Sequence, residues 1–479
     1  MMKKLSVFLS IFLTLVLVLA SCGGEPAVTT PDTTTPADTT PAVTEPNSAA
    51  ALWTQIEQAM DALTSYESEM SMDMTMYVEG YKIVGTSTGR TVEIARENDF
   101  YYYQMITTTA KSEEMLVDQT TVNLMGYENN KMFHSYTENG VEKQRFVSRI
   151  LPENFAAYLA EKNGEEINFS DCVNASFRKN EDGTWTLVYS GYTSRTINTL
   201  TESLGLVADT MGAPIVDMEI TITADAEYRV QRLEYSFVFA EQATASPVVQ
   251  MTATYSNYNT ATPVEGAFDP ATYMEIPDIR ILSWITDSLT EYSNADQGAF
   301  TLEIKQTTKA LGSTHTYTET DTVSYGKKNG AYFYDIGVVT SDGTMSLQFS
   351  NNLQTVVIDG ETYSEYATSA DAKATVDSLI HTAGYNELLV YEMTKVSDGV
   401  YALNCTVEPM LRDSVLQSLG GGFCDDSSQI ILVTIKDGKV EKLESSITIK
   451  GRVQSGSVSF TLELDTVNTF HTEGIPATE

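Results

Sequence analysis

Apolar residues recur at every second position through much of the chain, which is typical of strands with one buried face. The clearest run is EMSMDMTMYVEG at residues 69–80. Its methionines Met70, Met72, Met74 and Met76 would point to one side of a strand and the residues between them to the other. Asn-Gly or Asp-Gly pairs separate several runs and predict tight hairpins. These pairs are Asn139-Gly140, Asp182-Gly183, Asp342-Gly343, Asp359-Gly360, Asp398-Gly399 and Asp437-Gly438.

A three-to-four-residue spacing of apolar residues predicts an amphipathic helix ahead of each set of strands. In the first half Trp53, Ile56, Met60 and Leu63 share this spacing, and Ser48 stands where an N-cap belongs. In the second half the spacing follows Pro277-Asp278 and is carried by Leu282, Ile285 and Leu289. Shorter helical patterns interrupt the strands at 151–162 and 194–210, and again at 371–384 and 409–419.

The C-terminal half resembles the N-terminal half at four places in the same order. The pairs are VQRLEYSFVF (230–239) with VEKLESSITI (440–449), MTATYSNYN (251–259) with FTLELDTVN (460–468), EDGTWTLVYS (181–190) with SDGVYALNCT (397–406), and NDFYYY (98–103) with NGAYFY (329–334). A period this long indicates duplicated domains, because solenoid repeats run about 20 to 50 residues. We therefore expect domains at 49–275 and 276–479.

Long alternating strands with few helices indicate an α+β fold that is mainly β. We predict two tandem copies of a curved antiparallel half-barrel sheet, each with helices on its concave side.

The N-terminus has the features of a secretory signal. A short basic region, an apolar run and small residues fill positions 1–21. The sequence Leu19-Ala20-Ser21-Cys22 resembles a bacterial lipobox. That resemblance implies lipidation of Cys22 and a stable membrane anchor, since two or more acyl chains hold a protein on a bilayer. Residues 22–48 then form a Thr/Pro-rich tether that has too few large apolar residues to build a core.

A lipidated chain with the order helix, strands, helices, strands resembles the LolA/LppX-type half-barrel lipoproteins. The resemblance covers residues from about 50 to 275 and from 278 to 479, and it rests on the pattern of predicted helices and strands. It implies a cavity between sheet and helices that holds lipid-like molecules. LolA itself is one soluble periplasmic domain, whereas this chain is tandem and anchored, so it looks closer to surface lipoproteins of Gram-positive bacteria. We expect it on the extracytoplasmic face of the cell membrane.

Charge and candidate chemistry narrow the function. The net charge of −36, from 65 acidic and 29 basic residues, argues against a nucleic-acid partner, because phosphate binding needs clustered Lys and Arg. The four histidines are scattered without metal-ligand spacing. The stretch Gly85-Thr86-Ser87-Thr88-Gly89 fits a hydrolase elbow by its letters, but strand-like TVEIA follows it where that motif needs a helix. We therefore predict no catalytic residues, no cofactor and no metal.

Cysteine usage leaves one question open. Besides Cys22 there are Cys172, Cys405 and Cys424, and an odd number cannot all pair within the chain. Cys405 and Cys424 flank the second copy's predicted helix, where a disulfide bridge between them is one possibility.

The methionine row can be interpreted as a metal site or as an apolar wall. Thioethers bind Cu(I), which favours the first. The matching stretch GAFTLEIKQ carries Phe300, Leu302 and Ile304 instead, and these side chains cannot ligate a metal. We therefore predict a ligand-binding concave wall made of Met70, Met72, Met74, Met76, Phe300, Leu302 and Ile304. Two functions stay open: non-catalytic binding of an apolar or lipid-like ligand, or a tethered surface protein with solid cores that binds another envelope component.

Overall fold

The structure is a computed structural model. It describes residues 45–78, 81–96, 99–112, 117–163, 172–192, 215–239, 248–328, 331–358, 360–408, 412, 416, 422–453 and 458–471. The predicted signal peptide, Cys22, nearly all of the tether and the predicted helix at 194–210 lie outside these residues, as does most of 409–419. No helix within the described ranges is both long and apolar enough to cross a membrane.

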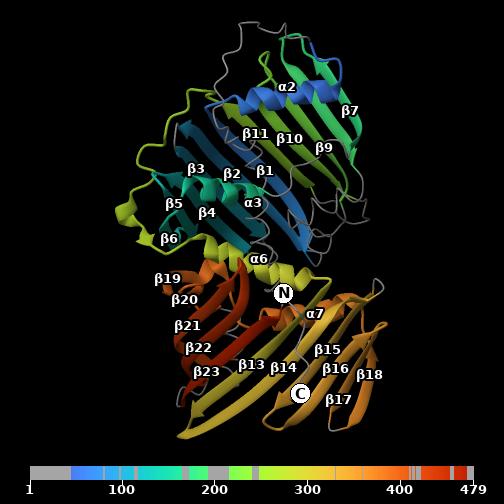
Figure 1. The fold of residues 1–479 in the computed structure, drawn as a ribbon, viewed down its shortest axis with the longest axis vertical. Helices are drawn as coiled ribbons and strands as arrows, with labels where there is room; N and C mark the ends of the chain where they lie inside the picture. The colour runs from blue at the N-terminus through green and yellow to red at the C-terminus, as the bar shows by residue number, and fades with distance from the viewer. Residues whose placement is uncertain are drawn as a thin grey trace. The chain divides into compact units, whose positions relative to one another are not determined.

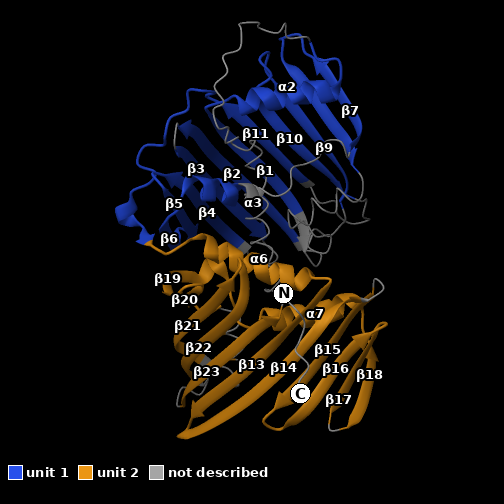
Figure 2. Cartoon of the chain, in the orientation of Figure 1, with its two compact units in different colours: residues 1–274 blue, residues 275–479 orange. Residues whose placement is uncertain are grey.

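The chain divides into two compact units, residues 1–274 and 275–479 (Figure 2). Each unit is built around one large antiparallel sheet with a few helices, so the prediction of an α+β fold that is mainly β is confirmed.

The first sheet has 12 strands in the order β12-β6-β5-β4-β3-β2-β1-β11-β10-β9-β8-β7 (Figure 1). Its strands are β1 (Ser65–Val78), β2 (Tyr81–Arg96), β3 (Asp99–Ser112), β4 (Val117–Glu128), β5 (Lys131–Glu138), β6 (Val141–Arg149), β7 (Cys172–Lys179), β8 (Trp185–Tyr192), β9 (Ile215–Ala224), β10 (Val230–Phe239), β11 (Val248–Ser256) and β12 (Met274–Glu275).

The second sheet has 11 strands in the order β18-β17-β16-β15-β14-β13-β23-β22-β21-β20-β19. Its strands are β13 (Gln297–Ala310), β14 (Ser313–Lys328), β15 (Ala331–Thr340), β16 (Gly343–Ser350), β17 (Leu353–Ile358), β18 (Glu361–Tyr366), β19 (Val390–Ser397), β20 (Val400–Cys405), β21 (Gly422–Lys436), β22 (Lys439–Val453) and β23 (Ser459–His471).

Apart from β12, the two sheets have the same strand order when each is counted from its first strand. In both, the first strand lies in the middle and pairs with the last: β1 with β11, and β13 with β23. β1 and β13 are each 14 residues long, and β2 and β14 are each 16. The four sequence similarities fall on strands with the same place in the two sheets: β10 and β22, β11 and β23, β8 and β20, β3 and β15.

Two helices lie on one face of the first sheet (Figure 1). Helix α2 (Ala49–Asp61) begins at the predicted cap, where the Ser48 hydroxyl accepts a hydrogen bond from the Ala51 N–H at 3.1 Å. It buries Leu52 and Ile56 against the sheet. Helix α3 (Pro152–Asn163) matches the predicted pattern at 151–162, and its Phe155 stacks on Tyr127 of β4.

The second unit has α6 (Arg280–Asn294) and α7 (Ser369–Ile380) on its sheet. In α6, Tyr292 stacks on Phe470 of β23 with ring centroids 4.3 Å apart. Helix α7 begins with a capping box between Thr368 and Asp371, one of the sequence patterns that start helices. It ends before the predicted residue 384. Short 3-10 turns are η2 (Pro270–Thr272) and η3 (Glu387–Leu389).

The opposite face of the first sheet is covered by the segment that follows β11. Phe268 in this segment stacks on Phe133 of β5, with centroids 4.7 Å apart. It also lies over Gly126, where an added Cβ would come within 1.8 Å of its ring. The Tyr101 hydroxyl accepts a hydrogen bond from the Val264 N–H at 3.0 Å. Strands β2–β5 are therefore buried on both faces around Val92, Tyr101 and Phe133, which a simple alternation of apolar and polar residues does not predict.

Candidate functional site: the helix-covered face of the first sheet

The methionine row lies on the face of the first sheet that carries α2 and α3, which we call the inner face. Met70, Met72 and Met74 are 5%, 1% and 3% exposed, whereas Glu69, Ser71 and Asp73 between them are exposed. The predicted alternation is confirmed for these residues. Met76 belongs to β1, but its side chain lies outside the described part of the structure.

More methionines surround this row. Met251 of β11 stands directly opposite Met72, and Met218 lies on β9, two strands further along the sheet. Both are 1% exposed and join one buried cluster with Met70, Met72 and Met74. Leu52 and Ile56 of α2 pack in the same cluster. We call the five methionines the methionine wall: Met70, Met72, Met74, Met218 and Met251.

A buried polar patch adjoins the methionine wall on strands β2–β4. Its members each have at most 6% of their surface exposed: Ser87, Thr91, Gln104, Thr108, Thr121 and Asn123. The patch begins next to the wall, because Ser87 pairs with Met72. From Ser87 the inner row continues to Thr108 and then to Thr121 on the next two strands.

Several hydrogen-bonding atoms of this polar patch have no partner. Ser87 and Thr108 share a hydroxyl bond of 2.8 Å, and Gln104 Nε2 donates weakly to Thr91 Oγ1 at 3.5 Å. Among the described residues, nothing pairs with three further atoms: Gln104 Oε1, Thr121 Oγ1 and Asn123 Oδ1. A buried polar atom left unpaired costs about 1–3 kcal/mol, so a ligand or water that paired with these atoms would relieve a real penalty.

The charges around the polar patch are one-sided. In β1–β4 the basic residues fall at the alternate positions, on the outer face: Lys82, Arg90, Arg96 and Lys111. Glu93 is on the inner face and accepts a hydrogen bond of 2.8 Å from the Tyr66 hydroxyl. Burial raises the pKa of Glu93, and this hydrogen bond lowers it in part. The inner face therefore offers carboxylate and neutral groups but no cation to a ligand on these strands.

His134 of β5 lies beyond the polar patch on the same face. Burial lowers its pKa to about 4, and its contact with Gln144, 3.2 Å from Nε2 to Oε1, opposes the shift in part. The imidazole is therefore neutral at pH 7.

The second sheet is different at the corresponding place. Phe300 and Leu302 are fully buried as predicted, but Ile304 is partly exposed. Leu302 pairs with Asn468, and Ile304 with Thr466. The first sheet pairs Met72 with Met251, whereas the second pairs Leu302 and Ile304 with polar residues. Ile304 is therefore less buried than Phe300 and Leu302, and the ligand-binding wall of these residues stays a prediction.

Asn468 has a structural task, since its Nδ2 donates to the carbonyl oxygens of Leu379 and Ile380 at the end of α7. Beside Leu302 on β14, Asp321 is 2% exposed. Burial and the charge of Glu319 raise the pKa of Asp321 to about 7. The inner face of the second sheet thus has an acidic and amide character in place of thioethers.

Cys405 and Cys424 are free thiols in the structure. Cys405 lies on β20 opposite Gln429, not opposite Cys424, so the possible bridge does not form. Burial raises the pKa of the Cys405 thiol to about 12, which keeps it protonated and unreactive.

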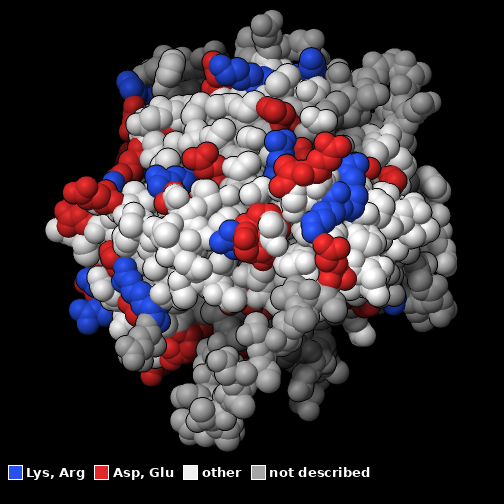
Figure 3. Space-filling view, turned by 90° about the horizontal axis from the view of Figure 1, so that it is seen from above, with Lys and Arg blue, Asp and Glu red and all other residues white. Residues whose placement is uncertain are grey.

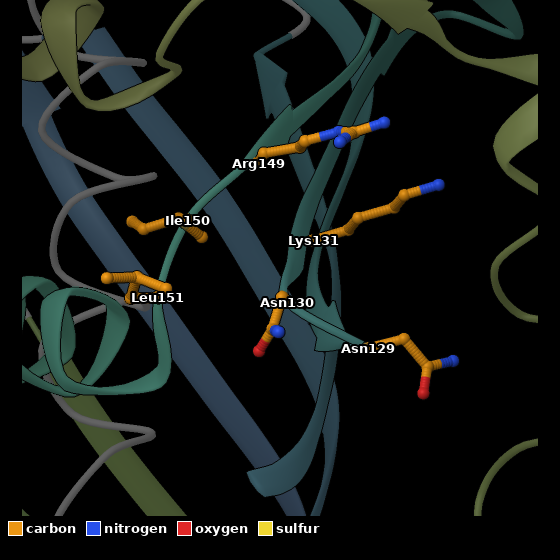
Figure 4. Close-up of a pocket in the computed structure, with 6 residues that line it drawn as sticks. All are labelled: Asn129, Asn130, Lys131, Arg149, Ile150 and Leu151. Carbon is orange, nitrogen blue, oxygen red and sulfur yellow. The ribbon is translucent and has the colours of Figure 1, made fainter.

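Two pockets lie away from the methionine wall. One of about 480 Å³ sits at the turn between β4 and β5 and the end of β6 (Figure 4). The Lys131 and Arg149 side chains extend to the same side of it, away from Leu151. Another, of about 340 Å³, lies against β14–β17 of the second sheet. The predicted wall residues line neither pocket.

Surface charge is mixed where it can be seen. In Figure 3 the Lys and Arg side chains lie beside Asp and Glu, without a continuous basic area. Ion pairs such as Arg229 with Asp225, at 2.7 Å, are of this kind. Within the described part of the chain, no three or more His, Cys, Asp or Glu side chains form a group that could hold a metal ion.

Comparison with known proteins assigns no family. No family model matches the chain, and no curated protein matches it. A putative AttH from Nitrosomonas europaea is 7% identical over 84% of this chain and 92% of its own, with a TM-score of 0.12. A double mutant of transferrin binding protein B from Haemophilus parasuis is 6% identical over 86% of this chain and 76% of its own, with a TM-score of 0.13. These structures are β-rich, but TM-scores this low do not indicate a shared fold. The LolA/LppX resemblance stays a prediction.

Sequence reasoning missed the polar patch. Its residues occur in stretches such as GTSTGR and YYYQMITTTA, in which small polar residues occupy both faces of a strand. Gly85–Gly89 lies within β2, and strand also follows it, as the sequence TVEIA predicts. The sequence does not show which of the neighbouring Ser and Thr side chains point to the inner face.

Proposed function

We propose that this chain is a membrane-anchored extracytoplasmic lipoprotein that binds an apolar or lipid-like ligand without catalysis. In this proposal Cys22 carries the lipid anchor, residues 22–48 are the tether, and the two sheets are half-barrels that arose by duplication. The cell surface of a Gram-positive bacterium is the favoured location.

The methionine wall is the observation that supports ligand binding most. Five methionines occupy β1, β11 and β9 of one sheet face beneath a helix. Methionine is flexible and polarisable, and surfaces rich in it adapt to ligands of varied shape. A core that only had to be filled would not need so much of it, as Phe300 and Leu302 illustrate in the second sheet. We therefore assign the ligand to the first unit.

Native mass spectrometry of the full chain extracted from cells tests this proposal. The protein should carry an extra mass that organic solvent removes and that an added fatty-acid methyl ester replaces. Met72→Gln should lose most of this mass, because it places an amide in the wall. Ser71→Gln, one residue away on the exposed side, is the matched control and should keep it.

A second function has its own supporting observation. Met70, Met72 and Met74 already pack with Leu52 and Ile56 of α2, so this part of the inner face is well filled. This favours a tethered surface protein with solid cores that binds another envelope component. Absence of a co-purifying mass and of any bound probe, together with a partner recovered by cross-linking, would support this alternative and reject ligand binding.

A further inference from the structure

The polar patch beside the methionine wall points to a ligand with two chemically different ends. The wall and the patch are continuous, because Met72 pairs with Ser87, and Ser87 with Thr108. The Met70 side chain reaches over Gly89, where its Cε lies 3.2 Å from the place that a Cβ would occupy. From β1 to β4 the inner face spans three strand spacings, or about 14 Å. This is enough for a small polar head with the first carbons of a chain.

The unpaired atoms specify the kind of head. Gln104 Oε1 and Asn123 Oδ1 are carbonyl oxygens, which only accept hydrogen bonds, and Thr121 Oγ1 can accept as well. All three residues are at most 6% exposed, so bulk water does not readily satisfy them. A group that fits them must therefore donate hydrogen bonds, as hydroxyl and amide groups do.

The charged residues of β1–β4 argue against a ligand with an anionic head group. The basic side chains of β1–β4 lie on the outer face, where Arg90 pairs with Glu67 and Lys111 with Asp118. Glu93 is on the inner face two residues from Thr91, on the same strand. A phosphate or carboxylate head would meet this carboxyl group and find no cation on the inner face of β1–β4 to pair with.

We infer that the first unit holds an uncharged amphiphile, with its chain on the methionine wall and a hydroxyl- or amide-bearing head on Gln104, Thr121 and Asn123. This inference rests on the proposed function and adds the class of ligand to it.

Three probes with the same oleoyl chain test the head. Monooleoylglycerol has two free hydroxyls, methyl oleate has no donor, and oleoyl lysophosphatidic acid has a hydroxyl and a phosphate. Each competes with a fluorescent monoacylglycerol, which is uncharged at its head, for the full chain. We expect monooleoylglycerol to bind at least tenfold more tightly than the other two, because each hydrogen bond it makes is worth about two- to tenfold in affinity.

Variants assign this difference to the polar patch. Thr121→Val combined with Asn123→Leu should bring monooleoylglycerol to within twofold of methyl oleate, with methyl oleate itself changed by less than threefold. Thr121→Val alone provides a milder version if the double variant does not fold. Thr120→Val, the neighbouring threonine on the outer face, is the matched control and should keep the tenfold difference.

The outcomes separate the two claims. If none of the three probes displaces the fluorescent one, the proposed function fails. If methyl oleate or the lysophosphatidate binds as tightly as monooleoylglycerol, ligand binding stands and the inference about the head is overturned. A tenfold difference that persists in both Thr121 variants would overturn it too, because the patch would then pair with water and not with the ligand.

Discussion

At the scale of single residues, the notable feature is polarity buried without partners. Thr121 and Asn123 are two residues apart on the same face of β4, and each has an oxygen that no other described residue pairs with. Folding usually avoids this, because each unpaired group costs about 1–3 kcal/mol. Sequence reasoning could find the methionines, which alternate with polar residues, but not this patch, because Thr and Ser in β2–β4 occupy both faces.

Thr121→Val should stabilise the protein without its ligand. Valine has the shape of threonine and no hydroxyl to desolvate, so the free energy of unfolding should rise by about 1 kcal/mol. Urea denaturation of delipidated protein measures it. Thr120→Val, on the outer face, should change the value by less than 0.5 kcal/mol, as is usual away from buried features. A loss of stability at Thr121 would mean that its hydroxyl is already paired.

His134 predicts a pH dependence of stability. Its pKa in the folded protein is about 4, below the ordinary value near 6.5, so the fold favours the neutral ring. Between these values the unfolded chain binds more protons, and stability is lost as the pH falls from about 6.5 to 4. His134→Gln should lose less stability than the parent protein between pH 7 and pH 5 in matched urea titrations. An identical loss in both proteins would show that the His134 pKa is unshifted.

At the scale of elements, the periodicity of apolar residues and the turn residues predicted the helices, strands and hairpins that local rules determine. The helix capped by Ser48, the strand of the methionine row and the Asn139-Gly140 hairpin all follow from local rules and are confirmed. The cover over the outer face was not foreseen. It depends on Phe268 meeting Gly126 across a long sequence separation, and no local pattern encodes such a contact.

The methionine strand should tolerate a change of side chain that keeps its bulk. Replacing Met70, Met72 and Met74 together with Leu preserves volume and the apolar pattern, so the fold should persist with a loss of less than about 1.5 kcal/mol per site. Circular dichroism and urea denaturation check this. Ligand affinity should fall, since leucine adapts less well than methionine. Loss of folding would contradict the interpretation of this row as an apolar strand face.

The contact between Phe268 and Gly126 can be tested by a double-mutant cycle. Gly126→Ala should destabilise the first unit by about 1–3 kcal/mol, because the new methyl group overlaps the Phe268 ring. Phe268→Leu gives that methyl group room, so the double variant should lose clearly less than the sum of the single losses. Strict additivity would show that the two residues do not touch.

At the scale of the whole molecule, the second sheet repeats the strand order of the first but not its inner chemistry. Met72 faces Met251 in one, and Ile304 faces Thr466 in the other. Sequence similarity was enough to match strands. It was not enough to predict what fills the space above them, because that depends on residues from several strands at once. We therefore expect the two units to have different tasks, with ligand binding in the first.

The proposed lipid anchor at Cys22 is tested on the full chain. Cells grown with labelled palmitate should incorporate label into the parent protein but not into Cys22→Ser. The variant should also leave the membrane fraction, since the acyl chains provide the anchor. Cys424→Ser is the control and should keep both label and location. Label that persists in Cys22→Ser would remove the lipoprotein assignment.

The most direct test of the central claim is photo-cross-linking with a monoacylglycerol that carries a diazirine near the end of its chain. Peptides of the irradiated full chain are mapped by mass spectrometry. Adducts should form on the methionine wall, in β1 and β11, and an excess of monooleoylglycerol should abolish them. Adducts confined to the second unit or to the outer face, or adducts that the competitor leaves unchanged, would contradict it.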